Sequence, residues 1–247
     1  MSNNAIIEIG RIAELFRYPI KSMAGIAIES SFLGWHGLGG DRRFAFRRVN
    51  EQGGFPWLTA SRLSALLCYQ PSGHDNNIEE PLPTHVRTPA GAELPLHSEE
   101  LRQELAEQFG SDLELMRLNH GIFDEAAVSV ISASTIEGVA RELGYELDRR
   151  RFRPNIVLET NQKKIFCEDD WVGGTLIFGD EEYGAAVNVT LRDLRCVMIN
   201  FDPDTAQNDS YVLKAVGRLN KGNAGVYGTV VRTGILNVGQ TVSLKRN

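Results

Sequence analysis

The residue of this sequence best suited to chemistry is a cysteine with arginines close to it. Cys196 directly follows Arg195 and lies four positions after Arg192. Nearby cations favour the thiolate over the thiol, so the sequence predicts a lowered pKa for this side chain. A thiolate binds a soft metal or attacks an electrophile. A lone cysteine is also often a small buried side chain, and the local sequence leaves both interpretations open.

Apolar residues alternate with other residues directly after this cysteine. Val197, Ile199 and Phe201 recur with the two-residue period of a half-buried strand. This pattern predicts a strand with Cys196 at its start. Pro203 lacks a backbone N–H and disfavours helical conformation in the residue before it, so we expect the strand to end there.

Other parts of the chain carry donors that suit an anion. Lys21 and Ser22 lie in an irregular segment between a proline and a glycine, and Arg42 follows a glycine-rich loop. Residues 149–153 contain four arginines, and Asn155 follows them. Cationic and hydroxyl donors suit a phosphate, and amide donors suit a polar heterocycle. Together with a soft metal ligand, this set indicates a metal carried on a phosphorylated organic cofactor.

The bulk composition limits the classes of function. The 247 residues suffice for one large domain or two small ones, and 42% hydrophobic with 23% charged residues is ordinary for a soluble globular protein. A net charge of −6 argues against a nucleic-acid or anionic-membrane partner. None of the three cysteines forms a CxxC pair, which argues against a zinc knuckle or an iron–sulfur cluster. The N-terminus carries no basic signal and no apolar run could span a membrane, so we expect a cytoplasmic protein.

The elements that must position these residues are mostly strands. Short apolar alternations between turns, together with 24 glycines, predict a mainly β fold with a few short helices (α+β). Strands are expected over residues 6–16, 26–33, 43–49, 84–88, 93–96, 113–118, 156–158, 175–180, 185–191, 225–232 and 235–244.

Two helices have clear boundary signals. Ser98 is a suitable N-cap for a helix that Gly110 would end. Ser134 and Glu137 match a capping box at the start of a second helix, which Gly144 would end.

The two remaining cysteines are predicted to be structural. Cys68 lies in an apolar run and is expected in the core. Cys167 precedes acidic residues, which should raise its pKa and make it a poor thiolate.

A set of short runs, in a fixed order along the chain, points to a known family. The runs are Tyr18-Pro19-Ile20-Lys21-Ser22, Gly37-Leu38-Gly39-Gly40-Asp41-Arg42-Arg43, Leu58-Thr59-Ala60-Ser61-Arg62, Arg151-Phe152-Arg153-Pro154-Asn155-Ile156-Val157, and Arg195-Cys196 with Asp202-Pro203-Asp204-Thr205. Together they resemble the MOSC family (molybdenum cofactor sulfurase C-terminal domain), in the form with a preceding MOSC N-terminal β-barrel region. The chain is similar to the mitochondrial amidoxime-reducing components and their bacterial relatives.

The resemblance implies an architecture and a set of functional residues. It implies an N-terminal β-barrel-like domain over residues 1–118 and a C-terminal MOSC β-barrel over residues 119–247, with a cofactor cleft between them. Cys196 falls on the cysteine that ligates molybdenum and is the implied catalytic residue. The implied binding residues for the molybdenum cofactor (Mo-molybdopterin) are Lys21, Ser22, Arg42, Arg153 and Asn155, with Thr59, Arg62, Ser132 and Ser134 as further candidates.

The implied reaction is a two-electron reduction of N-hydroxylated compounds, with oxygen transferred from a small-molecule substrate to molybdenum. A soft thiolate suits this metal because it tunes the potential and leaves other sites open. The electrons would come from a separate donor protein of ferredoxin, flavoprotein or cytochrome type. Two alternatives remain: a carrier of the cofactor or of sulfur as a Cys196 persulfide, and a β-rich domain with a buried cysteine.

The sequence departs from the amidoxime reducers close to the cysteine. Ile199-Asn200 stands in place of their common threonine pair, and Ala206 stands where a glycine usually follows Asp-Pro-Asp-Thr.

Overall fold

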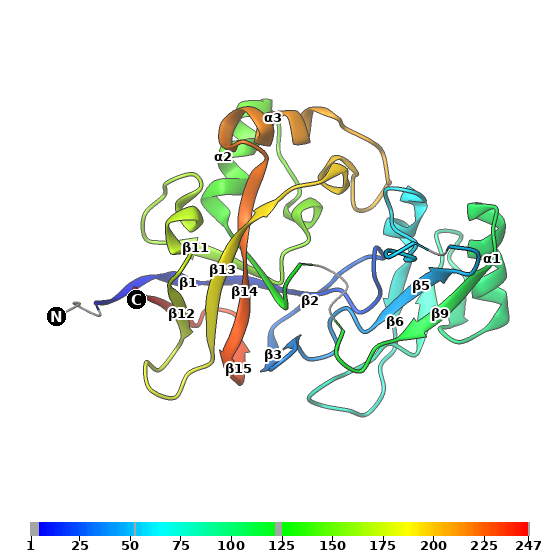
Figure 1. Cartoon of the computed structure of the whole chain (residues 1–247), viewed down its shortest axis with the longest axis horizontal. Coiled ribbons are helices and arrows are strands. Elements are labelled where there is room, and N and C mark those ends of the chain that lie inside the picture. Colours follow the sequence, from blue (N-terminus) through cyan, green and yellow to red (C-terminus); the bar gives the residue numbers. More distant parts are fainter. Residues whose placement is uncertain (1–4, 52, 122–124, 247) are drawn as a thin grey trace.

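A closed seven-stranded β-barrel lies at the centre of the computed structural model, which describes residues 5–51, 53–121 and 125–246 (Figure 1). The strands follow each other in the order β11-β10-β14-β13-β12-β16-β1, and pairing of β1 with β11 closes the ring. The barrel strands are β1 (Ile6–Arg17), β10 (Val128–Ser132), β11 (Ile156–Thr160), β12 (Thr175–Phe178), β13 (Ala186–Leu194), β14 (Asn223–Arg232) and β16 (Thr241–Lys245).

The first strand pairs with strands from the C-terminal half of the sequence. β1 is antiparallel to β11, to β16 and to the short strand β2 (Ile26–Ile28). A strand from the N-terminal part of the chain therefore completes a barrel whose other strands all follow residue 127. The predicted division of the chain between residues 118 and 119 stays a prediction.

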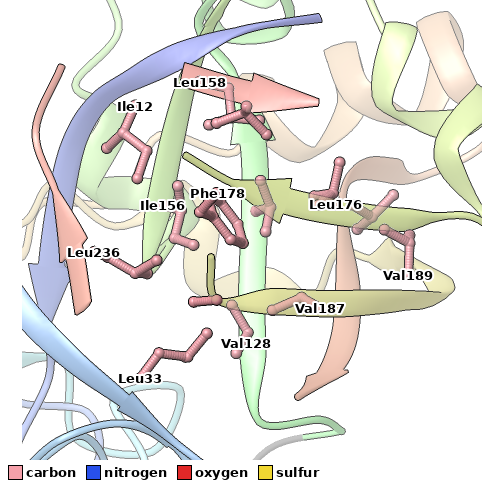
Figure 2. Close-up of a cluster of buried hydrophobic side chains, with 14 of the residues drawn as sticks. Ile12, Leu33, Val128, Ile156, Leu158, Leu176, Phe178, Val187, Val189 and Leu236 are labelled. Atoms are coloured by element: carbon pink, nitrogen blue, oxygen red, sulfur yellow. The ribbon is translucent and has the colours of Figure 1, made fainter. Parts of the chain in front are cut away.

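The interior of the barrel is filled by aliphatic and aromatic side chains from most of its strands (Figure 2). Ile12, Val128, Ile156, Leu176 and Phe178 are each at most 1% exposed. Fully burying a side chain of this size contributes about 1.5–3 kcal/mol, so this core fixes the barrel on which the following loops are mounted. The predicted fold class, mainly β with a few short helices, is confirmed.

The segment between β1 and β10 contributes several small sheets. Two of them lie entirely within this segment, and the third also takes a C-terminal strand. The strands are β3 (Ser30–Gly34) between β4 (Gly37–Leu38) and β15 (Gly234–Asn237), β5 (Phe44–Arg48) with β9 (Leu113–Arg117), and β6 (Gln70–Ser72), β7 (His85–Arg87) and β8 (Glu93–Pro95) in one sheet.

Helix α1 (Glu99–Phe109) and the 3₁₀-helix η1 (Ser64–Cys68) complete this N-terminal unit. The Ser98 side chain accepts a hydrogen bond from the Leu101 N–H, and Gly110 ends the helix in a left-handed conformation, as predicted. Leu101 and Leu105 join a second core that is separate from the barrel interior.

Helices α2 (Ala133–Leu143) and α3 (Tyr211–Asn220) pack together over a third core outside the barrel (Figure 1). The predicted capping box at Ser134 is wrong: the N-cap is Ser132, whose hydroxyl accepts from the Thr135 N–H. The two serines are two positions apart, so the helix starts two residues earlier than the sequence pattern indicated. None of the helices in the described ranges has the length and apolar character needed to cross a bilayer.

The predicted strand after Cys196 is also wrong. Val197–Asn200 form a 3₁₀-helix, η4, and Cys196 precedes it in an extended conformation. The apolar residues of this turn serve different cores: Ile199 is buried beside α3, whereas Met198 packs against the core of the N-terminal unit. The other 3₁₀-helices of the described residues are η2 (Arg149–Phe152) and η3 (Cys167–Trp171), besides η1 in the N-terminal unit.

Candidate functional site

The loop between β1 and β2 holds Lys21 and Ser22 in a fixed position. The backbone N–H of Lys21 donates to the Phe44 carbonyl at 2.8 Å, and Ile20 forms a parallel bridge with Phe44. Both Lys21 and Ser22 are buried. The Lys21 Nζ lies 5.5 Å from the centre of the Phe55 ring, so an aromatic face supports its charge.

Tyr18 carries two guanidinium groups on its ring. The Arg153 Cζ lies 4.2 Å and the Arg42 Cζ 5.2 Å from the ring centre. The Arg153 Nη1 also donates to the Met23 carbonyl at 2.8 Å. Burial raises the pKa of the Tyr18 phenol, so the ring remains neutral beneath two cations. Arg42 and Arg153, which are 111 positions apart in the sequence, thereby contact the same aromatic ring.

A buried polar network fixes Arg42. Its Nη1 donates to Asp41 Oδ2 at 2.5 Å and to Asn155 Oδ1 at 3.2 Å, and its Nη2 donates to the Arg153 carbonyl at 3.3 Å. Asp41 Oδ1 accepts from the Tyr18 N–H at 2.6 Å. A charge held by several bonds in a buried site keeps one orientation, so the network preorganises the cationic loop.

The backbone of this region adopts an uncommon conformation at three predicted site residues. Ser22 (φ 65°), Arg42 (φ 48°) and Arg153 (φ 48°) all lie in the left-handed region. Such conformations are rare for residues other than glycine, and they cluster at functional sites. The three residues are drawn from three separate loops, and each loop is held by the contacts described above.

Cys196 is exposed at the end of β13, directly before η4. The neighbouring arginines that the sequence suggested as activators of this thiol have other partners. Arg195 pairs with Asp193 at 2.8 Å and its Nη1 donates to the Phe152 carbonyl at 2.9 Å, and Arg192 pairs with Asp169 at 3.5 Å. The arginines therefore anchor the cysteine segment to the protein.

Two successive arginine contacts connect the cysteine segment to the Lys21 loop. Arg195 binds the carbonyl of Phe152, and the next residue, Arg153, binds the carbonyl of Met23. Met198, two positions after the cysteine, packs against the core that includes Met23. The segment that contains Cys196 is thus linked, through two arginine–carbonyl contacts, to the loop that carries Lys21 and Ser22.

Ser132 and Ser134, at the start of α2, have partners outside the Tyr18 cluster. The Ser132 hydroxyl donates to Glu168 Oε2 at 2.7 Å. It lies at the end of β10, three residues beyond Ser129, whose N–H donates to Asn155 Oδ1. Ser134 lines a separate cavity of about 200 Å³ beside Lys163. Neither serine has a contact with the cationic loops among the described residues.

Thr59 and Arg62 belong to a loop of the N-terminal unit. The Thr59 hydroxyl lies 2.8 Å from that of Ser61, and the Thr59 carbonyl accepts from the Arg62 N–H at 2.9 Å. Arg62 is exposed. These contacts are local, so the role of Thr59 and Arg62 in cofactor binding stays a prediction.

A hollow of about 570 Å³ runs along the arginine segment before Arg153. Its arginines are matched by acids: Arg150 pairs with Asp148 and Asp204, both at 2.6 Å, and Arg151 with Asp202 at 3.1 Å. Cys196 and Lys21 do not line it. We therefore take the Tyr18 cluster and the linked Cys196 segment as the candidate site, because Arg42 and Arg153 meet at Tyr18 and the cysteine is exposed, whereas the arginines of this hollow are paired with acids.

The other two cysteines are poorer nucleophiles. Burial raises the pKa of the Cys167 thiol, and the charge of Glu168 raises it further, in the direction predicted from its acidic neighbours. Cys68 is partly buried, and its Sγ donates to the Asp204 carbonyl at 3.2 Å. Burial also raises the pKa of Cys68.

Tyr18 and Asp41 are site residues that the sequence reasoning did not select. Both lie inside runs that carried the resemblance, each within three positions of a selected residue. The signal was present, because a buried aromatic residue between cations and an acid before an arginine both suit a preorganised anion site.

Sequence profiles identify the class of protein to which this β-barrel belongs. The chain belongs to the MOSC family: the MOSC domain profile matches residues 99–243, and that of the MOSC N-terminal beta barrel domain matches residues 9–103. MOSC domains are associated with molybdenum-cofactor binding and sulfur-carrier roles.

One solved structure shares the fold at low sequence identity. The crystal structure of the YUAD protein from Bacillus subtilis is 13% identical, with a TM-score of 0.53 and 98% of each chain covered. YiiM from Geobacillus stearothermophilus is 20% identical, with a TM-score of 0.35 over 48% of this chain and 53% of that chain. Among curated proteins, none matches the sequence.

The residues present fit a molybdenum cofactor. Three cationic side chains and a hydroxyl come from loops joined around Tyr18, which suits an anionic organic group. The exposed thiol of Cys196 supplies the soft ligand that such a metal prefers.

Proposed function

We propose that this protein binds the molybdenum cofactor with the Sγ of Cys196 as metal ligand and reduces N-hydroxylated compounds. The observation that carries the proposal is the link between the exposed cysteine segment and the Lys21 loop through the contacts of Arg195 and Arg153. Family membership adds independent support for the cofactor.

The side chains have distinct roles in this proposal. Lys21, Ser22 and Arg42 hold the phosphate and pterin parts of the cofactor, as point-charge, hydroxyl and bidentate donors. Tyr18 and Asn155 keep the guanidinium groups of Arg42 and Arg153 in place before the cofactor arrives, which lowers the cost of ordering them on binding.

When bound, the cofactor supplies two-electron redox chemistry. The overall reaction converts R–NH–OH, two electrons and two protons into R–NH₂ and water. The thiol of Cys196 loses its proton when it binds the metal, because the thiolate is the ligand. Exposure of the cysteine leaves room for a small substrate to approach the same point from solvent.

A sulfur carrier is the second candidate. The exposure of Cys196 also suits a persulfide, because a sulfur atom passed between proteins must be accessible. Wild-type protein that carries labile sulfur on Cys196 but no molybdenum, after production in cells that make the cofactor, would favour the carrier.

The test compares two cysteine variants of cofactor-loaded protein. Benzamidoxime reduction is measured with dithionite-reduced methyl viologen as electron donor, so that no protein partner is needed. Cys196→Ser should lower turnover by at least about 100-fold, because a metal ligand is lost. Its melting temperature should match that of the wild type, because the side chain is exposed.

Cys167→Ala is the matched control, since it removes a thiol from the same unit without touching the proposed site. It should retain turnover. The proposal is contradicted if Cys196→Ser reduces benzamidoxime as fast as the wild type.

A further inference from the structure

Two histidines from separate loops lie side by side on the surface. The ring centres of His36 and His120 are 5.0 Å apart, and the ring planes are inclined at 52°. Both side chains are exposed. Among the described residues, neither imidazole has a hydrogen-bond or ion-pair partner. The ring nitrogens of both residues are therefore available to a ligand from solvent.

The loop that carries His36 is a tight hairpin. Strands β3 and β4 pair with Gly34 opposite Gly37, so Trp35 and His36 form a two-residue turn. Gly37 has a positive φ of 100°, and a Cβ at this position would lie 2.4 Å from the Ala127 carbonyl oxygen. Only glycine allows this close approach, which holds the hairpin against the chain just before β10.

The loop that carries His120 is anchored on both sides of that residue. Before it, the Leu118 N–H donates to the Arg43 carbonyl at 2.9 Å, and the Arg43 Nε donates to the Leu118 carbonyl at 2.9 Å. After it, a Cβ at Gly121 would lie 2.4 Å from the Arg42 carbonyl oxygen, so the two backbones are in close contact. The backbone positions of the two histidines are thus fixed by neighbours of each.

The spacing of the two rings suits a single metal ion. A metal–nitrogen bond to histidine is about 2.0–2.1 Å long, and the ring centre lies about 1.2 Å beyond the nitrogen. Two imidazoles that bind one ion at about 90–110° therefore have ring centres about 4.5–5.3 Å apart. The observed 5.0 Å falls within this range. Because both side chains are exposed, rotation can turn a nitrogen of each ring toward the ion.

We propose that His36 and His120 together bind one divalent transition-metal ion of the class that prefers imidazole, such as zinc. Histidine is the commonest metal ligand and suits zinc, copper and nickel, whereas calcium and magnesium require oxygen ligands. No group of three or more ligating side chains gathers within the described ranges, so water completes the coordination shell. The bound ion would tie the hairpin of β3 and β4 to the segment that follows β9. This site is separate from the residues of the proposed function.

The test is a calorimetric titration of the full chain, freed of metal with a chelator, with zinc chloride. We expect one zinc ion per chain. His36→Ala and His120→Ala should each weaken zinc binding by at least about 10-fold, because each variant removes one of two ligands that act together. Zinc should raise the melting temperature of the wild type more than that of either variant, because binding stabilises only the folded state. Without zinc the melting temperatures should agree, since both side chains are exposed.

His74→Ala is the matched control, because it removes an exposed histidine from a loop that follows β6. It should bind zinc as tightly as the wild type. X-ray absorption at the zinc edge gives a second readout, with imidazole nitrogens expected at about 2.0–2.1 Å and no sulfur at about 2.3 Å.

Two results would overturn the inference. If both single variants bind zinc as tightly as the wild type, the two histidines form an aromatic contact only. If sulfur appears in the zinc shell, the ion is held by a cysteine instead. Neither readout depends on molybdenum or on turnover, so failure of the proposed function leaves the outcome of this test unchanged.

Discussion

Cys167 and Cys196 make an informative pair, because both stand at the start of a 3₁₀-helix in the barrel unit. Cys167 begins η3 in the interior, where its Sγ lies within 3.9 Å of the Thr160 hydroxyl and 3.7 Å of Glu168 Oε2. Cys196 precedes η4 on the surface. The same residue type in the same kind of turn therefore has opposite access to solvent, and access decides which thiol can meet a metal.

The surroundings of the two thiols differ in charge as well. Cys167 lies beside Glu168, a carboxyl group that is 0% exposed and accepts from the Ser132 and Thr135 hydroxyls. The segment of Cys196 is bonded instead to the loops that present Arg153 and Lys21. Burial and the neighbouring carboxyl group both raise the pKa of the Cys167 thiol.

Alkylation with iodoacetamide should separate the two thiols most strongly. We expect Cys196 to react about 100-fold faster than Cys167 in the folded protein, because attack requires an accessible thiolate and a buried thiol reacts only after local opening. Cys68, which is partly buried, should fall between them. Mass spectrometry of peptides over time measures the three rates. Equal rates for Cys167 and Cys196 would remove the basis of the comparison.

The next largest effect tests how Tyr18 prepares the cationic side of the site. Tyr18→Leu should lower cofactor retention about 10-fold, because two cation–π contacts worth about 0.5–1 kcal/mol each are lost. Tyr18→Phe keeps the ring and should retain the cofactor. Pterin fluorescence per chain after desalting measures retention, with circular dichroism as the check on folding. Equal losses in both variants would show that the aromatic ring does not contribute to cofactor retention.

Glu168 gives the smaller, pH-dependent effect on the Cys167 side. Burial raises the pKa of this carboxyl above its ordinary 4.5 in the folded protein. A raised folded pKa contributes stability that is complete below pH 4.5 and is lost as the pH rises through the folded value, at no more than about 1.4 kcal/mol per pH unit. Glu168→Gln should abolish this contribution.

Urea unfolding of the wild type and of Glu168→Gln between pH 4.5 and 8 measures the difference. As the pH rises, the free energy of unfolding of the variant should increase relative to that of the wild type. A gap that stays constant across this range would mean that Glu168 has an ordinary pKa in the fold.

Much of the fold could be predicted because the signals are local. The apolar content of residues 6–16 without a helix cap, and the caps at Ser98 and Gly110, depend on neighbouring residues, and the structure confirms the strand and the helix. Pairing of β1 with β11 and β16 joins segments more than 140 residues apart, so no local pattern could reveal it. The turn after Cys196 was mistaken for a strand because Val197, Ile199 and Phe201 alternate by residue type. In the fold Val197 is exposed, Ile199 is buried in the core beside α3 and Phe201 packs against the core of the N-terminal unit, so they share no face.

The site was predictable by residue type but not by conformation. The resemblance selected Ser22, Arg42 and Arg153, but residues other than glycine give no sign in the sequence that they will adopt positive φ. Ala206 also has a positive φ of 56°, a conformation that glycine adopts without strain. The roles of Arg192 and Arg195 could not be foreseen, because their partners Asp169 and Phe152 are distant in the sequence.

Molybdenum content is the most direct measurement of the central claim. Wild type, Cys196→Ala and Cys167→Ala are produced in cells that make the cofactor, and metal per chain is determined by plasma mass spectrometry. We predict that the wild type and Cys167→Ala retain molybdenum and that Cys196→Ala loses it while keeping the wild-type fold. Retention of wild-type molybdenum by Cys196→Ala would contradict the assignment of this sulfur as the metal ligand.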